Sequence, residues 1–96
     1  MALFVEKKPR SGGFPRQVKA VKVQTEAEYA SELLDFLNPA WESVEILENP
    51  PRVKMSHGRR CFIAYEGQWI VNPYAGAYFP MREDHFTMMY EPVEAN

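Results

Sequence analysis

The chain has 96 residues and carries 13 acidic and 11 basic side chains, which gives a net charge of −2. Its length fits one small domain, and its 46% hydrophobic and 14% aromatic content excludes intrinsic disorder of the chain as a whole. The slight negative charge excludes an overall positive field that would attract nucleic acid or anionic lipid. The single cysteine excludes an internal disulfide, and no hydrophobic run reaches the length of about 18 residues that a membrane-spanning helix needs.

The first 16 residues are predicted to form an extended, basic N-terminal arm, and residues 17–96 a single domain. Residues 6–16, with the sequence EKKPRSGGFPR, contain two prolines and two glycines. Such a segment forms neither a helix nor a strand ladder efficiently. We therefore expect the arm to be ordered only where a neighbour holds it.

A strand and a helix are predicted next. Residues 17–24 alternate polar and β-branched side chains, which is typical of a strand. Thr25 and Glu28 then form the T-x-x-E pattern of a capping box, in which each side chain satisfies a free backbone N–H at the start of a helix. Asn38-Pro39 ends the helix, because proline disfavours helical backbone in the residue before it. The hydrophobic stripe of this helix is predicted to comprise Ala30, Leu33, Leu34 and Leu37.

Turn residues divide the following part of the chain into four short predicted strands, over residues 43–48, 52–56, 60–65 and 68–72. The last two are expected to pair as a hairpin through Glu66-Gly67. A short helix is predicted over residues 82–90. The order of strand, helix, four short strands and short helix indicates a small α+β domain, with a mostly antiparallel sheet packed on one main helix.

The two strands of the expected hairpin are hydrophobic on both faces. Cys61, Ile63 and Tyr65 point to one side of their strand, with Phe62 and Ala64 on the other, and Trp69 and Val71 similarly oppose Ile70. A sheet of this kind needs cover on both faces. The main helix covers one face, whereas the short helix, about 12 Å long, covers only part of the other. We therefore expect some hydrophobic surface to remain exposed for self-association or for another protein.

Charge is segregated along the chain. Residues 25–49 carry seven acidic side chains and no basic one, whereas residues 50–60 carry four basic side chains and no acidic one. One interpretation is that these blocks neutralise each other in the fold. The alternative is that the basic block forms an open face.

No combination of residues indicates catalysis, and the chain is predicted not to be an enzyme. His57, Cys61 and His85 lack the spacing of a zinc site, and the cysteine is interpreted as a small core residue. The phosphate loop, the G-x-G-x-x-G motif and the G-x-S-x-G motif are absent. We therefore predict no catalytic residue, no metal and no cofactor.

The strongest polar cluster is a group of basic residues beside aromatic side chains. Guanidinium groups next to aromatics on a sheet would suit the bases of RNA, but the glycine of the RNA-recognition strand motif is missing and the chain is acidic overall. Nucleic acid is therefore disfavoured without being excluded, and charged protection of an exposed strand edge is the simpler interpretation. The candidate binding surface comprises Arg52, Lys54, His57, Arg59, Arg60, Tyr65, Trp69, Tyr74 and Tyr78.

Several segments together resemble a family of small bacteriophage and prophage accessory proteins of uncharacterised function. The start matches at Lys7-Lys8-Pro9, the first predicted strand at residues 18–23 and the end of the helix at Phe36-Leu37. The more specific matches lie in the last third of the chain. They are GQWIV at residues 67–71, GAYFP at residues 76–80, Phe86, and YEPV at residues 90–93.

This resemblance implies a phage setting and no particular activity. Gln68 and Ala77 stand where the family pattern has an aspartate and a glutamate, which further disfavours carboxylate-dependent catalysis. The leading hypothesis is a non-enzymatic accessory protein that binds a host or defence-system component in the cytoplasm of the infected bacterium. Alternatives are a virion-associated decoration protein and a small-ligand sponge for a nucleotide, with Arg59 and Arg60 in its pocket. The expected partner is a host or phage protein or another copy of the chain, and no membrane association is expected.

Overall fold

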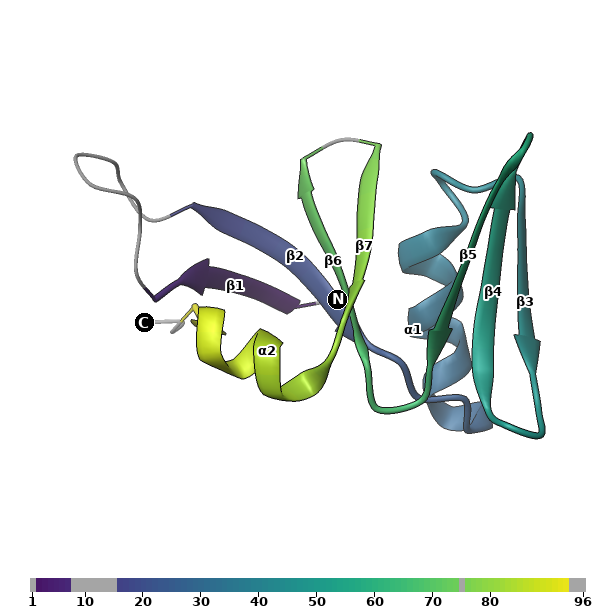
Figure 1. Ribbon diagram of the computed structural model, residues 1–96, viewed down its shortest axis with the longest axis horizontal. Coiled ribbons are helices and arrows are strands. Elements are labelled where there is room, and N and C mark those ends of the chain that lie inside the picture. Colours follow the sequence, from purple (N-terminus) through teal and green to yellow (C-terminus); the bar gives the residue numbers. More distant parts are fainter. Residues whose placement is uncertain (1, 8–15, 75, 94–96) are drawn as a thin grey trace.

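The computed structural model describes residues 2–7, 16–74 and 76–93, which form two helices and eight strands in two antiparallel sheets (Figure 1). The larger sheet has the order β7-β6-β2-β1-β8, and the smaller one the order β3-β4-β5. The α+β class and the antiparallel pairing are therefore confirmed. Strands provide more of the fold than the sequence indicated.

The elements are bounded as follows. The larger sheet contains β1 (Ala2–Glu6), β2 (Gln17–Lys22), β6 (Trp69–Tyr74), β7 (Ala77–Met81) and β8 (Tyr90–Pro92). The smaller sheet contains β3 (Ser43–Leu47), β4 (Arg52–His57) and β5 (Arg60–Tyr65). The helices are α1 (Ala27–Leu37) and α2 (Glu83–Met89).

The predicted hairpin between residues 60–65 and 68–72 is wrong, because β5 and β6 belong to different sheets. The turn between them bonds to the chain that follows β2. The Gly67 N–H donates to the Val23 carbonyl at 3.0 Å, and the Val23 N–H donates to the Gln68 carbonyl at 2.8 Å. The side chain of Gln68 also satisfies the last backbone N–H of β5, because its oxygen accepts a hydrogen bond from the Tyr65 N–H at 2.8 Å. These bonds direct β6 onto β2 and away from β5.

The predicted arm needs correction at its start, where Ala2–Glu6 form β1 between β2 and β8. Phe4 explains this pairing, because its buried ring packs edge-on against Trp69 and Phe86. Lys7 follows and donates from its backbone N–H to the Met89 carbonyl at 2.9 Å, and from its amino group to the Thr87 carbonyl. A lysine at this position complements the negative end of α2. Residues 8–15 of the predicted arm lie outside the described residues.

The predicted capping box is also wrong. Helix α1 begins at Ala27, and its N-cap residue, Glu26, makes no side-chain capping bond. The Thr25 N–H and hydroxyl instead donate to the Glu66 carboxylate at 3.1 Å and 2.9 Å. Thr25 thus bonds to the distant carboxylate of Glu66 and does not cap the first turn of the helix together with Glu28.

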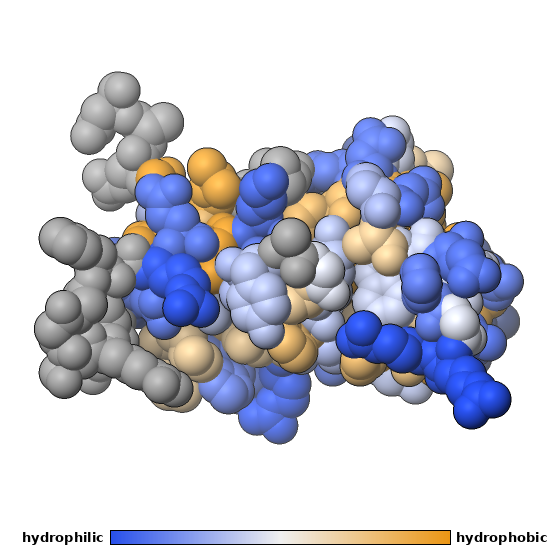
Figure 2. Space-filling view, turned by 90° about the horizontal axis from the view of Figure 1, so that it is seen from above, coloured by the Kyte–Doolittle hydropathy of each residue, from blue (hydrophilic) through white to orange (hydrophobic). Residues whose placement is uncertain are grey.

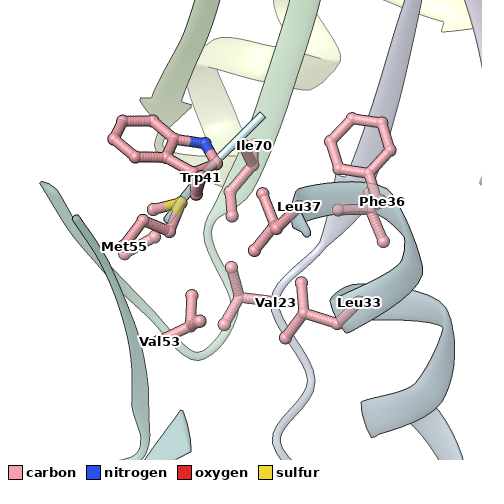
Figure 3. Packing of buried hydrophobic residues seen from close by; sticks show 10 residues of the cluster. Val23, Leu33, Phe36, Leu37, Trp41, Val53, Met55 and Ile70 are labelled. Atoms are coloured by element: carbon pink, nitrogen blue, oxygen red, sulfur yellow. The ribbon is translucent and has the colours of Figure 1, made fainter. Parts of the chain in front are cut away.

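Two hydrophobic cores lie on opposite sides of β6. The first joins α1, the end of β2 and the inner face of the smaller sheet (Figure 3). The second joins the larger sheet to α2 through Phe4, Val18, Ala20, Val71 and Phe86. Ile70 faces the first core and Val71 the second, and both are buried, so the predicted cover on both faces is confirmed for β6. Helix α1 contributes Leu33 and Leu37 as predicted, together with Phe36, which the predicted stripe omitted.

Candidate docking face

The smaller sheet has one covered and one uncovered face. Its inner face packs on α1 through side chains such as Val53, Met55 and Ala64. Figure 1 shows the sheet at one end of the molecule, with α1 on its inner side. The outer face, which we call the docking face, consists of the alternate residues of the three strands in their observed register. Its members are Ser43, Glu45 and Leu47 from β3, Arg52, Lys54 and Ser56 from β4, and Cys61, Ile63 and Tyr65 from β5.

Strand β5 supplies the hydrophobic row of the docking face. The side chains of Ile63 and Tyr65 are 40% and 44% exposed, and Cys61 is also exposed. The opposite side of the same strand is covered, since Ala64 is buried and Phe62 is half-buried. The predicted exposure of hydrophobic surface is therefore confirmed for this side of β5. The interpretation of Cys61 as a core residue is wrong, because the odd-numbered residues of β5 face outward.

Two basic residues lie beside this row on β4. Arg52 stands opposite Tyr65 and Lys54 opposite Ile63. The Arg52 guanidinium donates to the carbonyls of Glu48 and Pro50 at 3.1 Å and 2.8 Å, which holds the turn between β3 and β4. Lys54 is exposed and forms no ion pair with any described residue. Its amino group is therefore available to a partner.

Two ion pairs among the described residues lie outside the basic block of the sequence. They are Lys22–Glu83 at 2.8 Å and Arg82–Asp84 at 2.9 Å. The second pair lowers the pKa of Asp84, mainly through the hydrogen bonds that Arg82 donates to its carboxylate and further through the His85 N–H. Neither pair includes a basic residue of the segment 50–60. Glu45 of the acidic block lies opposite Lys54 of the basic block in the register of β3 and β4, so these ion pairs decide for neither interpretation and both stay predictions.

The nine predicted surface residues lie in several places. Arg52, Lys54 and Tyr65 share the docking face, and Arg59 lies in the exposed turn between β4 and β5. His57 is exposed at the end of β4, on the inner side of the strand.

The other four predicted residues are elsewhere. Arg60 points inward, with its guanidinium carbon 6.0 Å from the Trp41 ring centroid. Trp69 stacks on Phe86 with centroids 4.2 Å apart. Tyr78 packs against Trp41, and its partial burial raises the pKa of its hydroxyl. Tyr74 is 61% exposed on the larger sheet.

The sequence-based selection omitted Ile63, the central hydrophobic side chain of the docking face. The alternation of residues 60–65 could have identified it, because Ile63 must share a face with Tyr65. Choosing residues by charge and aromaticity missed it. Figure 2 shows charged and polar side chains around hydrophobic ones at this end of the molecule.

A second exposed hydrophobic surface lies on the larger sheet. Leu3 is 47% exposed there, and it lines a shallow hollow of about 330 Å³ together with Lys19, Asn72 and Tyr74. This hollow lies beside the start of β2, and the link that precedes β2 includes residues outside the described part. We assign no site to it.

Within the described residues, no group of three or more histidine, cysteine, aspartate or glutamate side chains is placed to hold a metal ion. Neither described helix is both long and hydrophobic enough to cross a membrane. No protein-family model, no curated protein and no solved structure matches this chain.

Proposed function

We propose that this chain is a non-enzymatic binding protein that attaches to another protein through the docking face. In the phage setting that the sequence resemblance implies, the partner is a host or defence-system component in the cytoplasm of the infected bacterium. The observation that carries this proposal is the exposed hydrophobic row of β5, with Ile63 at its centre and Lys54 beside it.

The composition of this face suits a protein partner. Interfaces between proteins that also exist separately combine a hydrophobic centre with a polar rim, and tyrosine and arginine are enriched in them. Ile63 and Tyr65 would supply the centre, with Arg52 and Lys54 at the rim. The same face carries only one aromatic ring, whereas proteins that bind single-stranded nucleic acid stack successive bases on several. This difference favours protein over nucleic acid.

The contacts support the alternative of a protein that sequesters a small nucleotide ligand less than they support protein binding. That alternative places Arg59 and Arg60 in one pocket with neighbouring aromatics. Arg60 lies over Trp41 and Phe62 on the inner side of β5, whereas Tyr65 points outward. A virion-associated role would use the docking face as well, and mass spectrometry of purified particles distinguishes it from an intracellular role.

Affinity capture from infected cells tests the proposal. Immobilised wild-type chain should retain specific proteins that Ile63→Asp loses, because a carboxylate at the centre of an interface is costly to desolvate. The matched control is Leu3→Asp, which makes the same change at an exposed leucine of the larger sheet. It should retain the same proteins as wild type. Identical capture by wild type and Ile63→Asp would disprove docking through this face.

A further inference from the structure

We propose that a second copy of this chain covers the docking face with the acidic side of its helix α1. The inference rests on the docking face proposed above, but it does not depend on which foreign protein binds there. The second copy would occupy the face when no other partner is present.

The surface of the second copy that would cover the docking face is identified by its negative charge, which is opposite to that of Arg52 and Lys54. Glu28 and Asp35 are exposed on the side of α1 opposite its buried leucines. Together with Ser31 and Glu32 they line a shallow hollow of about 430 Å³, next to Phe36. Of the residues that the structure describes, none of those lining this hollow is basic. Glu28 and Asp35 are therefore the acidic counterparts of the lysine and arginine on the docking face.

The two faces cannot meet within one chain. Helix α1 packs on the inner face of the smaller sheet through Leu33 and Leu37. Lys54 is on the outer face of that sheet and points into the solvent. The sheet therefore lies between them. Only another molecule can bring the acidic side of α1 to the docking face.

The spacing of the charges permits this contact. Arg52 and Lys54 are two residues apart on a strand, about 7 Å at their Cα atoms. Glu28 and Asp35 are separated by two turns of helix, about 10 Å. The long side chain of Lys54 bridges the difference, since the Arg52 guanidinium is held by the Glu48 and Pro50 carbonyls. Glu45 lies opposite Lys54 on the same face and offsets one positive charge, so the complementarity is partial.

The expected association is weak and sensitive to salt, because exposed ion pairs contribute little individually and are screened. The contact joins two different surfaces, and each copy carries one of each. Such heterologous association continues beyond a dimer unless a ring closes. The average mass should therefore rise steadily with concentration.

Sedimentation equilibrium with charge-reversed variants tests the inference. At about 50 mM salt the wild-type mass should rise with concentration, and at about 1 M salt, where the screening length is about 3 Å, it should return to that of a monomer. Lys54→Glu and Asp35→Lys should each weaken association about tenfold, because each places like charges together. An equimolar mixture of the two should restore it, since the reversed charges are complementary.

Two control variants change the charge equally at other exposed positions. Lys19→Glu on β2 and Glu91→Lys on β8 should associate as the wild type does. A wild-type chain that stays monomeric at low salt would overturn the inference, as would a mixture that fails to associate. Neither result affects the capture experiment with Ile63→Asp, so the two proposals fail separately. The salt dependence of the wild type tests the inference even where a variant folds poorly.

Discussion

Strands β5 and β6 follow each other in the sequence and are both hydrophobic on two faces, but only β6 is covered on both. Ile70 and Val71 of β6 are buried in different cores. On β5, Ala64 is buried whereas Ile63 on the other side is 40% exposed. Similar local patterns therefore have different environments.

Topology explains the difference. Strand β6 lies between β2 and β7, with α2 packed on one face and the α1 core on the other. Strand β5 is at the edge of the smaller sheet, which has a helix on one side only. A strand with two hydrophobic faces is thus a core element in one place and an interface element in another. Such a strand is a core element where other elements cover both faces of its sheet, and an interface element where only one face is covered.

Matched isoleucine substitutions test this comparison most strongly. Ile70→Ala should reduce the free energy of unfolding by about 2–5 kcal/mol, because it leaves a cavity where no side-chain surface is exposed. Ile63→Ala removes the same atoms from the exposed side of β5 and should cost less than about 1 kcal/mol. Chemical denaturation of both variants measures the difference. Equal losses would show that the outer face of β5 is covered in solution.

Much of the fold can be predicted from the sequence where local patterns decide it. Strand β2, helix α1, the strands of the smaller sheet and helix α2 all lie close to their predicted positions, because alternation and helical periodicity are local signals. The partner of each strand is not a local property. Val23 and the Glu66-Gly67 turn are far apart in the sequence, and their hydrogen bonds direct β6 to β2.

The docking face was predictable only in part. The two hydrophobic faces of residues 60–65 and 68–72 indicated that some hydrophobic surface would stay exposed without indicating which face, and the basic residues of β4 were identified. Trp69 was included in the candidate binding surface, but its stacking on Phe86 depends on α2, which comes later in the chain. Arg60 was assigned to the same surface as Tyr65, although residues an odd number of positions apart on a strand point to opposite faces. Its contact with Trp41 requires the tertiary fold.

The turn that separates β5 from β6 offers a second test, with a smaller effect. Gly67 has a φ angle of +92°, which side chains with a Cβ rarely adopt. No atom lies within 4 Å of an added Cβ, so Gly67→Ala is penalised by conformation alone. We expect a loss of about 1–2 kcal/mol in the free energy of unfolding. Gly58→Ala, in the turn between β4 and β5, has a comparable φ angle of +60° and open space, and should cost a similar amount. A far larger loss for Gly67→Ala would indicate that the turn controls the division into two sheets.

The smallest expected effect concerns Glu66, which fixes the same turn to the start of α1. Hydrogen bonds from the Thr25 backbone and hydroxyl lower the pKa of this carboxyl from 4.5. A carboxyl with a lowered pKa in the folded state stabilises the fold above its unfolded-state pKa, and this contribution is lost as the pH falls through the folded-state value. Stability should therefore decrease below about pH 4.5, and Glu66→Gln should reduce that dependence.

Denaturation at pH 7 and at pH 3 measures the effect. Wild type and Glu66→Gln should differ at pH 7 and converge at pH 3, because protonation removes the charge that the substitution removes. Glu91→Gln serves as the control, since among the described residues its carboxylate accepts no hydrogen bond. A difference between wild type and Glu66→Gln that persists unchanged at pH 3 would mean that the ionised carboxylate does not hold the turn. The divergence of β5 and β6 would then depend on the backbone bonds of Val23 and on the bond between the Tyr65 N–H and the Gln68 side chain.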